Sequence, residues 1–429
     1  MHHRGSATIL LAVLLACSGC ASAANAAPAS ATAIPTLFAS PAPFTNPSET
    51  DAPALTPTPD PTALPSSTPL LTPTPTATPT VATSSPCTNL SQLATWNDSR
   101  LAMMVIAVPV SESAPSAALQ EVTAGAGGLL LFGASAPSNL GSQLASLETH
   151  VPGHLGLLVM TDEEGGGVQR MANLVGSLPW PAWMGANWST AQIQAAVTRV
   201  ARNMYANGVN MDLAPVVDVD GSNVAPSATN PDGWRSFGGN TAVVTRDGIA
   251  FMTGLKAGNV IPVLKHFPGL GGSSGNTDNG SAQTLPWSTL QQVAIPPFAT
   301  AIRAGAPAIM VSNAKVPGLT TMPASLSPAV MAELRTTLQF HGLVMTDSLS
   351  AGAISAAGFT VPVAAVQALR AGADMVMFGL PATTSATVSQ TFAIRSAMVS
   401  AVANGTLARS RLIAAAGAVL AARHVNLCA

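Results

Sequence analysis

Eight short apolar segments recur between residues 87 and 429, and each ends near a glycine or a polar residue. Segments of this length and composition are typical of strands buried on both faces of a parallel sheet. They cover residues 101–108, 127–133, 155–162, 209–219, 260–267, 307–313, 343–349 and 373–379. The repetition therefore favours an α/β fold built on a parallel sheet.

Several of these runs are separated by segments with helical spacing. Residues 189–207 place Ile193, Val197, Val200 and Met204 on one face of a helix. Residues 362–371 and 391–403 have similar patterns, and residues 407–423 predict an Ala-rich terminal helix. Eight strands alternating with helices over about 340 residues predict a (β/α)8 barrel. The alternative is an open doubly wound sheet, but no GxGxxG motif follows the first run, which disfavours its dinucleotide-binding form.

The few charged residues gather at the ends of the predicted strands. Only 8% of the chain is charged, yet strand ends carry Asp162, Asp212, Asp218, Lys265, His266 and Asp347. Any one of these residues alone would be an ordinary surface or capping charge. In a barrel, however, the carboxyl ends of all strands meet on one face, where active sites lie. We therefore expect a shared polar site there.

Seven sequence stretches carry a resemblance to a known family. They are TDEEGGGVQR (161–170), NMDLAPVVDVD (210–220), RSFG (235–238), KHFPG (265–269), PASLS (323–327), FHGLVMTDSLS (340–350) and AGADMV (371–376). Their order and spacing resemble the glycoside hydrolase family 3 β-N-acetylglucosaminidases in their single-barrel form, over nearly all of residues 87–429. The resemblance implies a retaining glycosidase that removes terminal β-linked N-acetylglucosamine, with a covalent glycosyl-aspartate intermediate.

The resemblance also implies roles for individual residues. Asp347, at the end of the seventh predicted strand, occupies the place of the nucleophile. A carboxylate suits this role because it stabilises an oxocarbenium-like transition state before bonding to the sugar. The residues that match the family's sugar-binding subsite are Asp162, Arg170, Arg235, Lys265 and His266.

The chain departs from the family pattern in the loop that carries the general acid/base. The family has KHFPGHG followed by DSH, whose His is the acid/base, whereas this chain has Leu270, Asp278 and Gly280 at the corresponding positions. Three alternatives stay open: Asp278 is itself the acid, another loop or the substrate supplies the proton, or the protein binds glycan with little turnover. A second departure is Gly167, where the family usually has Arg.

Two further functions compete with the enzyme prediction. One is a catalytically impaired glycan-binding lipoprotein on the same barrel, and the other is a family 3 enzyme of different specificity, such as a β-glucosidase. No cofactor and no metal is expected, because no Cys/His cluster has ligand spacing. Nucleic acid is excluded as a partner by the balance of 17 Lys+Arg against 19 Asp+Glu. We expect a monomer whose partner is a glycan containing N-acetylglucosamine.

Residues 1–20 have the order of a secretory signal, with a basic start, an apolar core and small residues after it. Their end resembles a bacterial lipobox, with Cys20 as the predicted lipidated residue and Cys17 as the alternative. An ordinary cleavable signal ending near Ala-Ser-Ala is also compatible. Residues 21–86 are rich in Pro, Thr, Ser and Ala and predict a disordered spacer. The protein is thus expected to be exported, either held on the outer face of the cell membrane by lipid or secreted into the cell wall, where peptidoglycan turnover would supply substrate.

Two cysteines, Cys87 and Cys428, stand at the two ends of the predicted barrel domain. An even pair of cysteines in an exported protein is a disulfide candidate, which would tie the first and last segments of the domain together. Two free thiols are the alternative.

Overall fold

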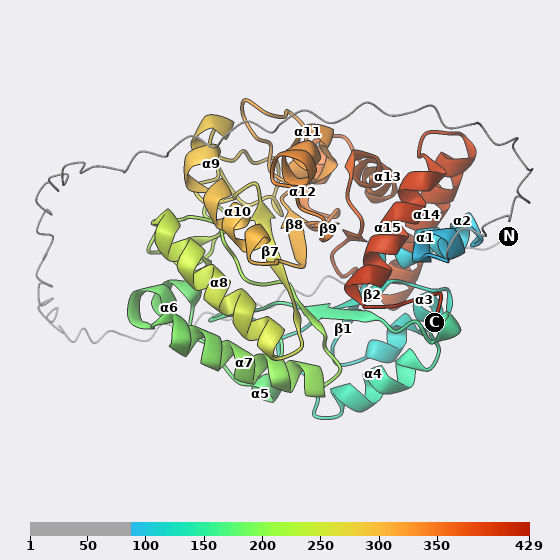
Figure 1. Ribbon diagram of the computed structural model, residues 1–429, viewed down its shortest axis with the longest axis horizontal. Helices are drawn as coiled ribbons and strands as arrows, with labels where there is room; N and C mark the ends of the chain where they lie inside the picture. Colours follow the sequence, from blue (N-terminus) through green and yellow to red (C-terminus); the bar gives the residue numbers. More distant parts are fainter. Residues whose placement is uncertain (1–86) are drawn as a thin grey trace, which may run out of the picture. The chain divides into compact units, whose positions relative to one another are not determined.

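The computed structural model describes residues 87–429 (Figure 1). The predicted export signal with Cys20 and Cys17, and the predicted spacer at residues 21–86, lie outside the described residues. Within residues 87–429, no helix combines the length and apolar character needed to cross a membrane.

Eight parallel strands form a closed barrel. They are β1 (Ile106–Ser111), β2 (Gly128–Phe132), β3 (Leu158–Thr161), β6 (Met211–Asp212), β7 (Ile261–Phe267), β8 (Ala308–Val311), β9 (Leu343–Thr346) and β10 (Val376–Met377). Neighbouring strands follow the order β10-β1-β2-β3-β6-β7-β8-β9. The ring closes between β9 and β10, where the Thr346 N–H donates to the Met375 carbonyl at 3.1 Å. The predicted (β/α)8 barrel is confirmed, and the closed ring excludes the open sheet.

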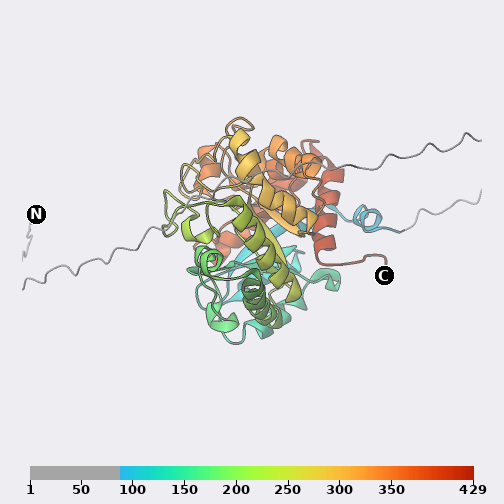
Figure 2. The ribbon, with the colours of Figure 1, turned by 60° about the vertical axis from the view of Figure 1, so that its left-hand side comes forward.

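Helices surround this barrel on the outside, as Figures 1 and 2 show. They are α1 (Asn89–Leu93), α2 (Asp98–Met104), α3 (Leu119–Thr123), α4 (Leu140–Glu148), α5 (Ala172–Val175), α6 (Pro181–Asn187), α7 (Thr190–Ala206), α8 (Thr241–Ala257), α9 (Trp287–Val293), α10 (Ile295–Arg303), α11 (Pro328–Ala332), α12 (Gly352–Ala356), α13 (Val361–Ala371), α14 (Thr384–Ala403) and α15 (Arg409–Ala422). A short antiparallel pair, β4 (Glu163–Gly165) and β5 (Val168–Gln169), follows β3. Short helical turns are η1 (Pro115–Ala118), η2 (Pro152–His154), η3 (Gly233–Arg235), η4 (Ala324–Leu326) and η5 (Glu333–Thr337).

The sequence of α7 shows how local signals place a helix on the barrel wall. Ser189 and Gln192 form a capping box at its N-terminus, which satisfies two backbone N–H groups. The predicted apolar face is buried, with Ile193 and Val197 fully covered. Each such side chain contributes about 1.5–3 kcal/mol relative to an exposed one. The cap thus fixes where the helix begins, and burial fixes which side faces the sheet.

Three predicted boundaries were wrong. Residues 101–104 of the first run belong to α2, because Asn97 caps that helix by accepting from the Arg100 N–H at 2.9 Å. The helix predicted at residues 391–403 begins earlier, at Thr384, where the Thr383 side chain caps it. The run at residues 209–219 forms a regular strand only at β6 and pairs with β7 again at Val216, which bridges to Lys265.

A disulfide joins Cys87 to Cys428, with an S–S distance of 2.01 Å. The same two segments are also joined by hydrogen bonds. The Asn89 side chain donates to the Val425 carbonyl at 2.7 Å and accepts from the Leu427 N–H at 2.7 Å. The first and last segments of the described chain are therefore fastened to each other next to α15.

Candidate active site

A polar cleft of about 410 Å³ lies at the carboxyl ends of the barrel strands. All seven residues that the sequence predicted for catalysis or sugar binding line it: Asp162, Arg170, Arg235, Lys265, His266, Asp278 and Asp347. The barrel brings them together because β3, β7 and β9 end on the same face, while Arg170, Arg235 and Asp278 come from loops above it.

Lys265 is the centre of an ion-pair network on the cleft floor. This residue of β7 is only 3% exposed, and its Nζ lies 2.8 Å from Asp162 Oδ1 and 2.7 Å from Glu164 Oε1. Arg235 holds Glu164 through two hydrogen bonds of 2.7 Å, and Arg170 lies 3.4 Å from Asp162. Buried charges are tolerated because each carboxylate faces at least two cations.

The network fixes the protonation states of its members. Burial opposes ionisation of Asp162, but Lys265 and Arg170 outweigh it and lower the pKa of that carboxyl. Burial also opposes the charge on Glu164, whose pKa is nevertheless held far below its usual range by Arg235 and Lys265. Burial disfavours the ammonium of Lys265 as well, yet Asp162 and Glu164 raise its pKa. All three groups are therefore charged at neutral pH and present fixed acceptors and donors to a ligand.

His266 is held by Asp218, which lies in the segment after β6. The His266 Nδ1 donates to Asp218 Oδ2 at 2.7 Å, and the same carboxylate accepts from the backbone N–H of Leu270 at 2.6 Å. Burial, together with the charges of Arg235 and Lys265, lowers the pKa of His266 to about 4. The imidazole is thus neutral at pH 7 and has one fixed orientation.

Asp347 directly follows β9 and is half-buried in the cleft. Its backbone N–H donates to the Val311 carbonyl at 2.9 Å, and its Oδ1 accepts from the Ser348 N–H at 2.6 Å. Burial raises the pKa of Asp347, and the negative charge of Asp278 adds to the rise, while His266 counteracts it. The carboxylate is consequently poorly solvated and well oriented, as a nucleophile requires.

Asp278 is exposed on the loop that follows β7 and lines the same cleft as Asp347. Its position depends on backbone hydrogen bonds to α12: the Gly352 N–H donates to the Asp278 carbonyl at 2.9 Å, and the Ala353 N–H donates to the Thr277 carbonyl at 2.9 Å. A Cβ at Gly280, the position of the family's catalytic His, would meet no atom within 4 Å. The loop therefore has room for a larger side chain that this sequence does not supply.

The second departure, Gly167, has a packing explanation. The ring of Trp180 lies over the turn between β4 and β5, and a Cβ at Gly167 would come within 2.8 Å of it. A Cβ at Gly166 would come even closer to the same ring, at 2.0 Å. Gly166 also adopts φ of +59°, which favours glycine. Trp180 thus occupies the space into which a longer side chain at residue 167 would extend.

Sequence reasoning missed two acidic residues near the cleft. Glu164 pairs with Arg235 and Lys265, and it could have been found from the three consecutive acidic residues in TDEEGGGVQR. Asp232 is buried just before η3, but its neighbours Asn230, Pro231 and Gly233 are typical turn residues. Nothing in that pattern indicates burial.

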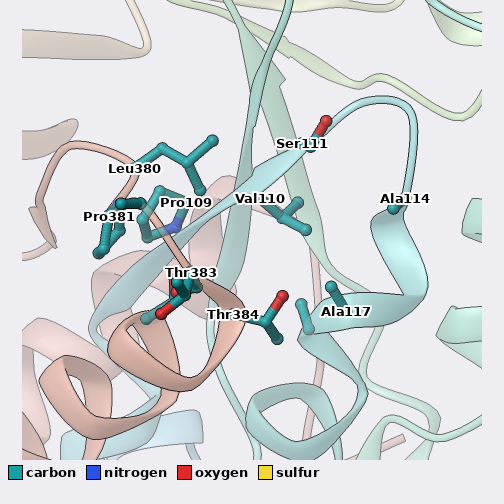
Figure 3. Close-up of a pocket in the computed structure, with 12 residues that line it drawn as sticks. Pro109, Val110, Ser111, Ala114, Ala117, Leu380, Pro381, Thr383 and Thr384 are labelled. Carbon is teal, nitrogen blue, oxygen red and sulfur yellow. Dashed lines mark hydrogen bonds between the residues drawn. The ribbon is translucent and has the colours of Figure 1, made fainter. Parts of the chain in front are cut away.

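A second, smaller cavity of about 160 Å³ lies between the end of β1 and the start of α14 (Figure 3). Its walls are made of apolar and hydroxyl-bearing side chains, among them Pro109, Leu380 and Thr383, and none of its lining residues is charged. It offers no acid, base or ion pair, whereas the polar cleft at the strand ends offers all three, and we take that cleft as the candidate active site.

Comparisons with known proteins show the family to which the chain belongs. The model of the family described as "Glycosyl hydrolase family 3 N terminal domain" matches residues 103–422. "Beta-hexosaminidase LpqI" of Mycobacterium tuberculosis is 38% identical over 233 residues, which are 53% of this chain and 59% of that protein. The alignment thus spans less than two thirds of that relative's length.

Solved structures give the same family. A family 3 glycosyl hydrolase from Mycobacterium smegmatis is 32% identical, with a TM-score of 0.67 over 77% of this chain and 98% of that one. A beta-N-acetylhexosaminidase from Beutenbergia cavernae is 30% identical, with a TM-score of 0.67 over 76% of this chain and 98% of that one. Together with the family match over most of the described barrel, these similarities show that the chain belongs to glycosyl hydrolase family 3.

Proposed function

We propose that this protein is a retaining β-N-acetylhexosaminidase that removes terminal β-linked N-acetylglucosamine. The observation that carries the proposal is the position of Asp347, a half-buried carboxyl group at a barrel strand end, in one cleft with a network of fixed charges. The names of the relatives from Mycobacterium tuberculosis and Beutenbergia cavernae support the substrate class.

In the first step, the Asp347 carboxylate would attack the anomeric carbon. A bond forms between that carbon and a carboxylate oxygen, while the bond to the glycosidic oxygen breaks. The leaving oxygen takes a proton from the acid, for which we propose Asp278. In the second step, Asp278 takes a proton from water, which attacks the same carbon and releases Asp347.

The sugar would be held by the charged groups on the cleft floor. Asp162 can accept hydrogen bonds from two hydroxyl groups, while Arg170 and Lys265 donate to hydroxyl or carbonyl oxygens. Glu164 orients Arg235 and Lys265 for the same purpose. His266, fixed by Asp218, adds a hydrogen bond in one defined direction.

The glycine at position 280 favours a second candidate function, that of a glycan-binding protein with little turnover. Gly280 supplies no imidazole, and Asp278 is exposed in the free protein. Loss of a general acid costs about 10²–10⁴-fold in rate. Binding would persist under these conditions, because the charged floor of the cleft is complete.

The test compares the wild-type protein with Asp347→Asn and Asp278→Asn on two aryl β-N-acetylglucosaminides, one with a good and one with a poor leaving group. We expect Asp347→Asn to lose both activities, and Asp278→Asn to lose mainly the poor leaving group, which needs protonation. An aryl β-glucoside serves as the specificity control. A folded wild-type protein that cleaves no aryl glycoside but still binds N-acetylglucosamine would replace the enzyme proposal with the binding protein.

We further propose export, with Cys20 lipidated and residues 21–86 acting as a spacer, so that the substrates are cell-wall fragments. A relative described as an "Uncharacterized secreted glycosyl hydrolase" from Arthroderma benhamiae, 32% identical over 66% of this chain, supports export. Labelling cells with a tagged fatty acid tests the anchor. Cys20→Ala should lose the label, and Cys17→Ala should keep it.

A further inference from the structure

Asp232 is a buried carboxyl group with no partner. It is 1% exposed, and neither of its carboxylate oxygens has a hydrogen-bond partner among the described residues. Burying an isolated carboxylate is costly, so such a group is normally paired, protonated or bound to a metal ion.

The cations near Asp232 are already paired with other groups. Arg235 donates two hydrogen bonds to Glu164, Lys265 lies between Glu164 and Asp162, and Arg170 faces Asp162. No salt bridge to Asp232 exists within residues 87–429. An ionised Asp232 therefore requires a partner from outside this network.

Two other potential ligands lie beside it. One donor atom from each of Asp218, Asp232 and His266 lies within 4.8 Å of the other two, and all three residues are buried. They come from three separate segments: after β6, before η3, and the end of β7. Ligand distances to Zn²⁺ are about 2.0–2.2 Å, so an ion here would replace the hydrogen bond between His266 and Asp218 and draw the three side chains together. This spacing in the sequence, 218, 232 and 266, matches no short metal-binding motif, which is why the sequence predicted no metal.

We propose that Asp218, Asp232 and His266 bind one divalent transition-metal ion beneath the floor of the cleft. One imidazole nitrogen with two carboxylates suits Zn²⁺ or Mn²⁺ better than Ca²⁺, which prefers six to eight oxygen ligands. The ion would tie the loop that carries Arg235 to β7, which carries Lys265 and His266. Its role is to hold the binding residues in place, and its presence is measured without any substrate.

The experiment uses the full chain, stripped with a chelator and then titrated with ZnCl₂, MnCl₂ or CaCl₂ alone. Calorimetry and elemental analysis give the affinity and the number of ions per chain. The variants are Asp232→Asn, which keeps the shape of the side chain, and Asp232→Leu, which removes its polar atoms. The matched control is Glu121→Gln, because Glu121 is also 0% exposed with both carboxylate oxygens unpartnered, but belongs to no such donor group.

We expect the wild type and Glu121→Gln to bind one equivalent of Zn²⁺ or Mn²⁺ more than either Asp232 variant does. If residual binding is seen in Asp232→Asn, its affinity should be at least about 100-fold weaker. The unfolding temperature of the wild type should rise with the metal, and that of the Asp232 variants should not. Equal stoichiometry and affinity in wild type and Asp232→Asn would overturn the proposal. A wild type that binds no ion would also overturn it, and a higher unfolding temperature of Asp232→Leu would then indicate that Asp232 is a buried, protonated carboxyl group.

Discussion

At the scale of single residues, Gly280 is the position that separates this chain from the pattern it otherwise follows. Its surroundings are open, and the backbone there has no positive φ. We expect Gly280→His to raise kcat on a poor leaving group by about 10–100-fold, since it adds a general acid two residues after Asp278. Rates for a good leaving group, which needs no proton, should change little.

The control for this variant is Gly280→Gln, which adds a side chain of similar length without a titratable group. An equal gain in both variants would assign the effect to packing of the loop rather than to proton transfer. A loss in Gly280→His alone would indicate that the imidazole cannot reach the leaving group from this loop.

Glu163, the neighbour of the predicted sugar-binding residue Asp162, predicts how stability depends on pH. Burial raises its pKa to about 7, although hydrogen bonds from the Met171 N–H and Gln169 oppose the rise. Between about pH 4.5 and 7 the folded protein therefore holds a proton that the unfolded chain releases, so Glu163 lowers stability as the pH rises through this range. The loss amounts to about 3 kcal/mol. Denaturant unfolding at pH 5 and pH 8 should show a weaker pH dependence in Glu163→Gln than in wild type.

Glu148→Gln serves as the control, because Glu148 is exposed at the end of α4. It should keep the wild-type difference between pH 5 and pH 8. If Glu163→Gln also keeps the wild-type difference in stability between pH 5 and pH 8, other carboxyl groups cause that difference.

The predicted cleft residues came together in the structure because each follows a strand or sits in a recognisable motif. Lys265, Asp347 and Asp162 were placed by their strand ends alone, since the barrel sends all of these to one face. Asp232 could not be predicted in this way. Its burial results from packing among Asp218, His266 and the loop before η3, and turn residues in sequence carry no information on such contacts.

At the scale of elements, the position of the loop that carries Asp278 depends on α12. A Cβ at Gly352, the first residue of this helix, would lie 2.7 Å from the Gly280 nitrogen and 2.8 Å from the Asp278 carbonyl oxygen. Both contacts are with backbone, so Gly352→Ala must displace the loop. Because a misplacement of about 1 Å can cost 10²-fold in rate, we expect a loss of about 10–100-fold on a poor leaving group.

Gly280→Ala is the matched control, since its Cβ meets nothing within 4 Å. It should retain the wild-type rate. Full activity in Gly352→Ala would show that the position of Asp278 does not limit the reaction.

The eight strands were predictable, but their exact limits were not. A buried helix and a buried strand give the same apolar run, so residues 101–104 could not be separated from β1 by hydrophobicity. The cap at Asn97 was the available signal. In the run at residues 209–219, Pro215 cannot donate to the ladder, but pairing with β7 resumes directly after it, at Val216.

At the scale of the whole molecule, the bond between Cys87 and Cys428 joins residues that are 341 positions apart in the sequence. Such a link restricts the unfolded chain more than the folded one, so its removal should cost about 2–5 kcal/mol. We expect reduction, or the pair Cys87→Ser and Cys428→Ser, to lower the denaturant midpoint while the activity of the folded protein is kept. Hydrogen bonds of Asn89 still hold the two segments together.

A reductant should have no effect on the double variant. An unchanged midpoint in reduced wild type would show that the two ends are already held together in the unfolded ensemble, or that the link does not form in the isolated protein.

The disulfide between Cys87 and Cys428 also changes the result of proteolysis of the barrel. Because the cross-link joins the two ends of the described chain, one cut in any loop between them leaves both fragments in a single covalent molecule. On a non-reducing gel the nicked protein would migrate as one species, and the fragments would separate only after reduction. A barrel cut once in an exposed loop would thus keep its halves at a high local concentration, ready to reassociate.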